Sequence, residues 1–299
     1  MEWLAQALVQ HGFIVAAVDH WGNTYDNKIP TEFLKPWERP LDIRFALTEL
    51  LRDPGFKHAI DPQRMGAAGF SYGGYTVLAL AGGVLDYQAL LAYYSTIGRR
   101  QLVPPELPEL ARYLNDSSLL AAGKRVPPLK DPRLKAFFAI APALGLGFVT
   151  RQQFAQVNQP VYLVGVQSDS VAPVKSGARH LQQLLAGAQY FEFPGTTGHY
   201  VMLSEATSEI RKSAPVYFAD DESVSRHRVH AQTAGLAIRF FNQQLSKSGS
   251  AEKKRWAVDA FPQGLPGGRR REVGGRNEVP HGRTSKRVGQ LGRQPEVFR

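Results

Sequence analysis

The chain has 299 residues, of which 43% are hydrophobic and 21% charged, as is typical of a globular protein with a substantial core. It has no cysteine, which excludes disulfides, thiolate metal sites and a cysteine nucleophile. The net charge is +10, but residues 246–299 hold 13 Lys and Arg against 5 Asp and Glu, which leaves only +2 for residues 1–245. We therefore expect a nearly neutral domain over 1–245 and a basic, disordered tail over 246–299.

Short apolar runs alternate with amphipathic stretches through the domain. In chain order, the expected elements are the strand Phe13–Asp19, the helix Leu41–Leu51, the strand Arg64–Phe70, the helix Tyr75–Leu80, the strands Leu134–Ala141 and Val161–Val166, the helix Val174–Leu185, the strand Tyr190–Phe193 and the helix Val229–Leu245. Runs that are apolar on both faces suit buried parallel strands. The pattern predicts an α/β fold with a doubly wound, mostly parallel sheet and helices on both faces.

Two segments depart from this alternation. Residues 98–133 are rich in proline, with a short helical piece near Leu110–Leu120, and we interpret them as a lid-like insert; surface decoration is the alternative. The tail from 246 onward has few large apolar residues, and at most a short helix is expected near Lys253–Ala260. No run approaches the roughly 20 apolar residues of a membrane span, and the start of the chain shows no signal peptide, so the compartment stays open.

A glycine-rich hexapeptide, Gly69-Phe70-Ser71-Tyr72-Gly73-Gly74, follows a predicted strand and precedes a predicted helix. It fits the Gly-x-Ser-x-Gly pattern of a nucleophile elbow, which exposes a serine hydroxyl on a sharp strand-to-helix turn. We expect Gly69 and Gly73 to let neighbouring backbone pass closely, and the N–H of Tyr72 to face a developing oxyanion. The alternative is a glycine-rich turn of a nucleotide-binding sheet, but no Gly-x-Gly-x-x-Gly or phosphate-loop lysine accompanies it.

A serine hydroxyl needs a base to become a good nucleophile, and the chain has eight histidines. His199 lies in a glycine-flanked loop after the last predicted strand, where the order Ser, Asp, His of such sheets puts the base. Its alternative role is to satisfy loop backbone. His20 ends a predicted strand and is a less favoured base, because it precedes the serine in the chain.

The third member of such a group is an acid that orients the histidine. Asp169 directly follows the predicted strand VYLVGV and is our candidate, with helix capping as its alternative role. Asp19 is the runner-up acid. Aromatic and histidine side chains near the expected strand ends and the insert are candidates for lining a substrate pocket: His20, Trp21, Tyr93 and Tyr94.

Five blocks, VAAVDH, IDPQRMGAAGFSYGGYT, DPRLKAFFAIAPALG, QPVYLVGVQSDSVAP and FPGTTGH, together resemble the dienelactone-hydrolase-like esterases, which are similar in turn to the platelet-activating-factor acetylhydrolases. The resemblance covers about residues 1–245. It implies an α/β-hydrolase fold and cofactor-free cleavage of carboxylic esters or lactones by Ser71, His199 and Asp169. The family has an earlier strand whose loop supplies a second oxyanion N–H, so we expect the first strands to be missing here through a misplaced start.

Two other functions are compatible with the sequence. The run Gly-x-Ser-Tyr-Gly-Gly-Tyr also resembles the prolyl-oligopeptidase family of serine peptidases, although no propeller domain precedes it. Alternatively, an impaired hydrolase fold could act as a binding module through its basic tail, but the tail lacks interleaved aromatic residues, so no nucleic-acid partner is expected. The expected partner is a small-molecule ester, with no metal and no cofactor; ester specificity and oligomeric state stay open.

Overall fold

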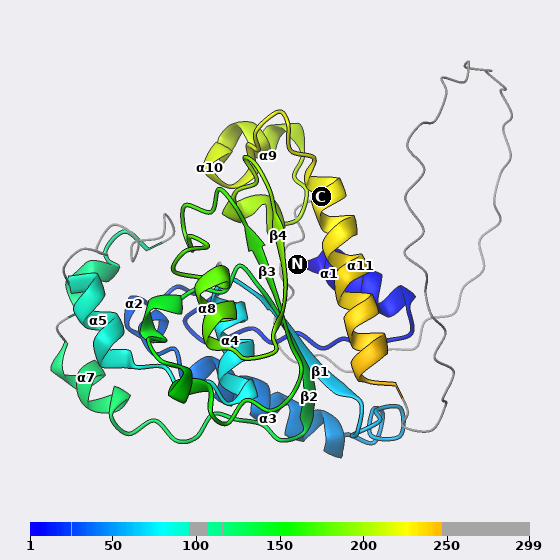
Figure 1. Ribbon diagram of the computed structural model, residues 1–299, viewed down its shortest axis with the longest axis horizontal. Helices are drawn as coiled ribbons and strands as arrows, with labels where there is room; N and C mark the ends of the chain where they lie inside the picture. Colours follow the sequence, from blue (N-terminus) through cyan, green and yellow to red (C-terminus); the bar gives the residue numbers. More distant parts are fainter. Residues whose placement is uncertain (25, 96–106, 115, 247–299) are drawn as a thin grey trace, which may run out of the picture. The chain divides into compact units, whose positions relative to one another are not determined.

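A parallel β-sheet forms the centre of the computed structural model, which describes residues 1–24, 26–95, 107–114 and 116–246 (Figure 1). Its strands are β1 (Met65–Phe70), β2 (Leu134–Ile140), β3 (Val161–Val166) and β4 (Gln189–Phe193). They pair in the order β1-β2-β3-β4, and every neighbouring pair is parallel. The predicted α/β class with a parallel sheet is therefore confirmed in the part of the chain that the structure describes.

Helices cover both faces of this sheet. The longer ones are α1 (Glu2–Gln10), α3 (Glu38–Arg52), α4 (Tyr72–Ala81), α5 (Tyr87–Ser95), α8 (Ala178–Leu184) and α11 (Arg226–Gln244). Shorter elements are α2 (Pro30–Phe33), α7 (Ser117–Gly123), α9 (Ser208–Ser213), α10 (Pro215–Phe218) and the 3-10 turns η1 (Leu110–Tyr113), η2 (Gly145–Gly147), η3 (Arg151–Phe154) and η4 (His199–Met202). In Figure 1, α1 and α11 lie side by side on one side of the sheet, while α3, α4 and α8 lie on the other.

The hydrophobic core has one layer on each face of the sheet. Because successive side chains of a strand point to opposite faces, Phe138 and Ile140 of β2 pack with α1 and α11. Their neighbours Phe137 and Ala139 pack with α3, α4 and α8. All four side chains are at most 1% exposed. Because β2 and β3 are covered on both faces in this way, their sequences are apolar at nearly every position instead of alternating.

The strand predictions hold for the sheet but fail at Phe13–Asp19. The other four predicted runs match β1 to β4 within one residue at each end. Residues 13–19 belong to no strand, and Ile14 is 54% exposed. A strand is defined by its hydrogen-bonded neighbour, and β1 pairs only with β2 in the described residues. Residues 13–19 therefore have the composition of a buried strand, but in the described residues no neighbouring strand pairs with them.

The helix predictions are correct in place but not always in extent. Three of them lie within α3, α4 and α11 or end one residue beyond. The fourth, Val174–Leu185, is too long, because α8 starts only at Ala178. Its first residues form turns in which the N–H groups of Ser176 and Gly177 both donate to Pro173 O. Gly177 has φ −113° and ψ −118°, which is not a helical conformation, so the regular helix begins after it.

The described part of the proline-rich insert packs on a third hydrophobic cluster. Leu110 of η1 and Leu119 of α7 are buried there against Leu34, Trp37 and Leu90, so this part rests on α2 and α5. Of the predicted insert, residues 98–106 and 115 lie outside the described residues. Residues 247–299 also lie outside them, including the short helix expected near residues 253–260, so the expectation for the tail stays a prediction.

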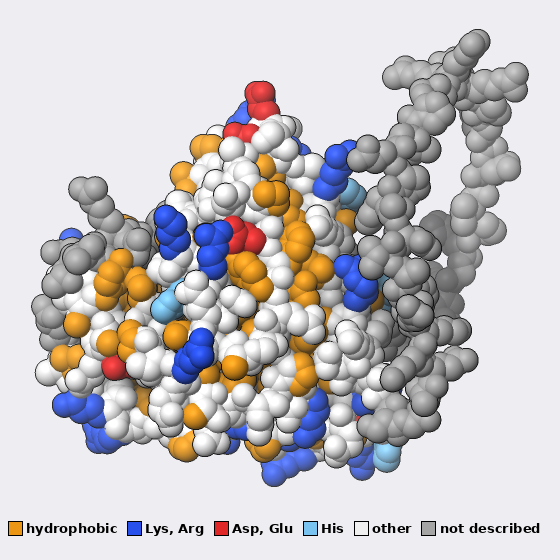
Figure 2. Space-filling view, viewed as in Figure 1, with side chains coloured by type: hydrophobic (Ala, Val, Ile, Leu, Met, Phe, Trp, Pro, Cys, Tyr) orange, Lys and Arg blue, Asp and Glu red, His pale blue; other side chains and the backbone are white. Residues whose placement is uncertain are grey.

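The surface of the described residues agrees with their small net charge. On the face shown in Figure 2, lysine and arginine side chains are distributed among hydrophobic and uncharged groups and do not gather into one patch. None of the described helices is both long enough and apolar enough to cross a bilayer.

Candidate functional site

Ser71 occupies a strained turn between β1 and α4. Its φ is +55° and its ψ −114°, a combination that side-chain-bearing residues seldom adopt. Three backbone hydrogen bonds hold this conformation: the N–H of Ser71 donates to Ile140 O at 2.9 Å, and its carbonyl accepts from the N–H groups of Tyr75 and Ala143. The strain fits a nucleophile elbow, because it lifts the hydroxyl out of the strand and off the helix surface.

The glycines around Ser71 have different roles. A Cβ on Gly69 would stand 2.2 Å from the carbonyl oxygen of Gly73, so the backbone passes this residue too closely for any side chain. The expectation for Gly73 itself is wrong, since a Cβ there would meet nothing within 4 Å. The second tight position is Gly74, where a Cβ would lie 2.9 Å from Pro142 Cα. Close packing of α4 against the loop after β2 therefore depends on Gly74.

His199 approaches Ser71 from the turn after β4. Its Nε2 lies 2.9 Å from Ser71 Oγ, although the two residues are 128 positions apart in the chain. The imidazole is 3% exposed and packs between the rings of Phe70, at 4.7 Å, and Tyr200, at 5.3 Å. The alternative base, His20, has a different partner, which leaves His199 as the histidine bonded to the serine.

Asp169, at the carboxyl end of β3, fixes the orientation of His199. Its Oδ2 lies 2.7 Å from Nδ1 of His199, and its Oδ1 accepts from the N–H groups of Val171, at 2.9 Å, and Ala172, at 2.6 Å. A carboxylate only accepts, so in the neutral imidazole Nδ1 carries the proton and Nε2 is free to accept from the hydroxyl of Ser71. The capping alternative is wrong for α8, whose N-cap residue is Gly177.

The N–H of Tyr72 is available at the start of α4. The first N–H groups of a helix lack intrahelical acceptors, and in the described residues no acceptor is found for this one. It belongs to the residue directly after Ser71, at the positive end of the helix dipole. The structure thus offers one backbone donor on the residue after Ser71, and its role toward an oxyanion stays a prediction.

The four predicted pocket residues lie in different surroundings, and their role in a substrate pocket stays a prediction. His20 is buried and its Nδ1 lies 2.7 Å from Asp42 Oδ2 on α3. Burial, followed by the nearby Arg39 guanidinium, lowers the pKa of His20 below its usual value, although Asp42 opposes the shift. Trp21 is 73% exposed. Tyr93 and Tyr94 stack edge to face at 5.7 Å, and Tyr94 is buried in the third cluster with the insert.

Sequence reasoning missed Arg39, which contacts Tyr72, the residue directly after Ser71. Its Cζ stands 4.8 Å from the centre of the Tyr72 ring, and its Nε donates to Thr76 Oγ1 at 3.2 Å. The Tyr72 hydroxyl donates in turn to Phe33 O. These contacts fix the side chain of Tyr72. The only signal in the sequence is the spacing of Arg39 and Asp42, which puts both on one side of the first turn of α3.

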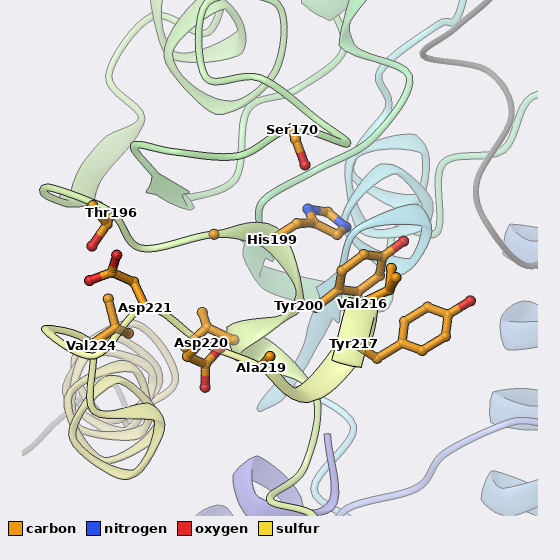
Figure 3. A pocket seen from close by; sticks show the side chains of 12 residues that line it. Ser170, Thr196, His199, Tyr200, Val216, Tyr217, Ala219, Asp220, Asp221 and Val224 are labelled. Atoms are coloured by element: carbon orange, nitrogen blue, oxygen red, sulfur yellow. The ribbon is translucent and has the colours of Figure 1, made fainter. Parts of the chain in front are cut away.

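A cavity of about 150 Å³ adjoins His199 (Figure 3). In Figure 3, Tyr200, Val216 and Tyr217 lie together to the right of His199, and Thr196 and Asp221 lie to its left. The rings of Tyr200 and Tyr217 meet edge to face at 5.0 Å. Sequence reasoning also missed this wall, because α10, which supplies Val216 and Tyr217, is a short element without a clear periodicity. In the described residues, no cluster of three or more His, Asp or Glu is arranged to hold a metal ion.

Comparison of the chain with protein-family models gave no match, and comparison with curated protein sequences gave no significant match either.

Proposed function

We propose that the protein is a serine hydrolase of the α/β-hydrolase type, similar to the dienelactone-hydrolase-like esterases, that cleaves carboxylic esters or lactones. The observation that carries this proposal is the continuous chain of hydrogen bonds from Ser71 Oγ to His199 Nε2, at 2.9 Å, and from His199 Nδ1 to Asp169 Oδ2, at 2.7 Å. The strained backbone of Ser71 and its position between a strand and a helix give independent support.

In the acylation step, Ser71 Oγ attacks the carbonyl carbon of the ester while His199 Nε2 accepts the hydroxyl proton. Asp169 stabilises the imidazolium that results. The N–H of Tyr72 donates to the oxygen that becomes negative in the tetrahedral intermediate. As the intermediate collapses, His199 gives its proton to the departing alkoxide, which leaves as an alcohol and an acyl group on Ser71.

Deacylation repeats these roles with water. His199 accepts a proton from the water as it attacks the acyl carbon, and then returns a proton to Ser71 Oγ as the acid is released. Val216 and the rings of Tyr200 and Tyr217 line the cavity next to this histidine, and we infer that part of the substrate binds there.

The test is labelling of the purified chain with a fluorophosphonate, with the modified residue located by mass spectrometry. We expect one adduct, on Ser71, and its loss in Ser71→Ala and His199→Ala. Ser170→Ala is the matched control, because Ser170 is an exposed serine beside the same cavity and should leave labelling unchanged. A folded wild-type chain that reacts no faster than its Ser71→Ala variant would refute the proposal.

The two other candidate functions are separated by further measurements. A peptidase uses the same serine chemistry, so we would compare an aryl ester with a proline-containing peptide anilide; we expect the ester to be cleaved and the anilide not. Deletion of residues 246–299 should leave esterase activity in place. If activity is absent from both forms while the full chain alone binds an oligonucleotide, the binding-module interpretation is favoured.

A further inference from the structure

The turn that carries His199 accepts hydrogen bonds from side chains of two helices that are far from it in the sequence. His230 of α11 donates from Nε2 to Val201 O at 2.7 Å, and Trp3 of α1 donates from Nε1 to Met202 O at 3.0 Å. The accepting residues are 1% and 0% exposed, so these carbonyls have little access to water. Since an unmet buried carbonyl is costly, both donors strongly favour this one placement of the turn.

Arg226, one helical turn before His230 on α11, continues the same pattern. Its Nη1 lies 3.4 Å from Leu203 O and 3.3 Å from Ser204 O. The rest of its guanidinium binds both carboxylate oxygens of Asp220, and Nη2 also donates to Tyr217 O at 2.9 Å. The carbonyls of residues 201–204 thus all face side-chain donors. Arg226 also ties this segment to the wall of the cavity beside His199.

The two donor rings support each other. Trp3 and His230 are stacked with their centres 4.2 Å apart and their planes 5° from parallel. His230 is 6% exposed, and burial lowers its pKa, so the ring is neutral at neutral pH. Leu4 and Leu8 bury α1 in the same cluster as α11. The stack is therefore held on both sides by helices that pack on the sheet.

We propose that Trp3, His230 and Arg226 are positioning residues that hold the imidazole of His199 within hydrogen-bond distance of Ser71 Oγ, an inference that rests on the proposed function. Backbone hydrogen bonds at the ends of the turn run from Val201 N–H to Gly198 O at 3.4 Å and from Leu203 N–H to Tyr200 O at 3.0 Å. Asp169 orients the imidazole ring of His199, whereas the three side-chain donors act on the backbone of the turn that follows it. A displacement of about 1 Å at a catalytic group can lower the rate by about 100-fold, so the side-chain donors set the catalytic geometry.

The experiment uses ring-preserving variants of the full chain. His230→Phe and Trp3→Phe keep an aromatic ring but lack the donor, while His230→Gln keeps a donor near the position of Nε2. Thr233→Val is the matched control: Thr233 is fully buried on α11, and its hydroxyl bonds only within the helix, to Val229 O. We would measure kcat and KM for an aryl ester and the rate of fluorophosphonate labelling, at a temperature where all variants are folded.

We expect His230→Phe and Trp3→Phe to lower kcat and the labelling rate by about 10-fold or more, with KM within about twofold of wild type. His230→Gln should recover most of the loss, and Thr233→Val should show none. A role in general stability alone would lower the melting temperature of all variants without this split. Rates in the Phe variants that equal those of Thr233→Val would overturn the proposal.

Hydrogen exchange separates this inference from the function it rests on. Peptides that contain residues 199–205 should exchange faster in His230→Phe than in wild type, whereas Thr233→Val should leave them unchanged. If the wild-type chain is not labelled at Ser71, the proposed function fails, and exchange decides the inference alone: faster exchange supports it, and unchanged exchange overturns it.

Discussion

Asp169→Asn changes the protonation of His199 without removing the contacts that place residue 169. Oδ1 of Asp169 accepts two backbone N–H groups, from Val171 at 2.9 Å and Ala172 at 2.6 Å. In the variant, the amide oxygen must occupy this position, because an NH₂ group there would face two donors. The NH₂ group then faces Nδ1 of His199, at the position where Oδ2 now lies 2.7 Å away.

This arrangement imposes the wrong tautomer on the base. Since the NH₂ group of the asparagine only donates, Nδ1 must accept, and the proton of the neutral imidazole moves to Nε2. Nε2 then has no lone pair for the proton of Ser71, which lies 2.9 Å away. The expected loss in kcat is about 10,000-fold, as for the same change in other Ser-His-Asp enzymes. That factor corresponds to about 5.4 kcal/mol in the activation free energy.

The assay is kcat for an aryl ester together with thermal unfolding. Because Asn keeps the acceptor for both N–H groups, Asp169→Asn should cost no more than about 1 kcal/mol in the free energy of unfolding. Asp169→Ala serves as the control, since it removes the carboxylate but leaves the tautomer of His199 free, and it should retain more activity than Asp169→Asn. Activity of Asp169→Asn within tenfold of wild type would refute this account of the site.

Three further predictions concern stability. Gly74→Ala should lower the free energy of unfolding in urea by about 1–3 kcal/mol through overpacking, whereas Gly73→Ala should leave it unchanged or raise it by up to about 1 kcal/mol; equal effects would contradict the packing difference. Asp131 is buried and forms an ion pair with Arg133, whose Nη2 lies 2.5 Å from Asp131 Oδ2. Asp131→Asn should lower the free energy of unfolding by about 2 kcal/mol in the same assay, because Arg133 then lies beside a neutral side chain; no loss would show that the pair does not contribute to stability. Burial lowers the pKa of His230 below 6.5, so the unfolded chain binds a proton at this histidine more readily than the folded chain does. The free energy of unfolding should therefore fall as the pH decreases from 6.5 through the folded pKa. Between about pH 7.5 and 5.5 the melting temperature of His230→Gln should change less with pH than that of wild type, and an equal slope in the two proteins would refute this.

The fold could be predicted where local sequence and burial agree. The runs that form β2 and β3 are apolar at nearly every position, as is typical of strands covered on both faces. The same logic fails at residues 13–19, because pairing depends on a neighbouring strand and not on the run itself. The helix α8 was predicted to start too early for a related reason. Val174 continues the apolar spacing of the helix, but the backbone of residues 174–177 does not form a regular helix.

The sequence by itself pointed to the turn at Ser71 and to the two residues, His199 and Asp169, that are hydrogen-bonded in series with it. Gly69 and Ser71 form a local turn, and the order of strands in a parallel sheet brings Asp169 and His199 to the same edge. Only the tertiary structure showed that Gly74, and not Gly73, packs against the loop after β2, since steric contacts depend on which backbone passes nearby.

Tertiary structure alone also decided what holds the His199 turn. Trp3 and His230 are far apart in the chain and carry no motif, yet α1 and α11 bring their rings together over the turn. The spacing of apolar residues indicates which face of a helix is buried, but not which carbonyl its polar side chains will hydrogen-bond. That choice depends on how the helices pack on the sheet, and packing is a property of the whole fold.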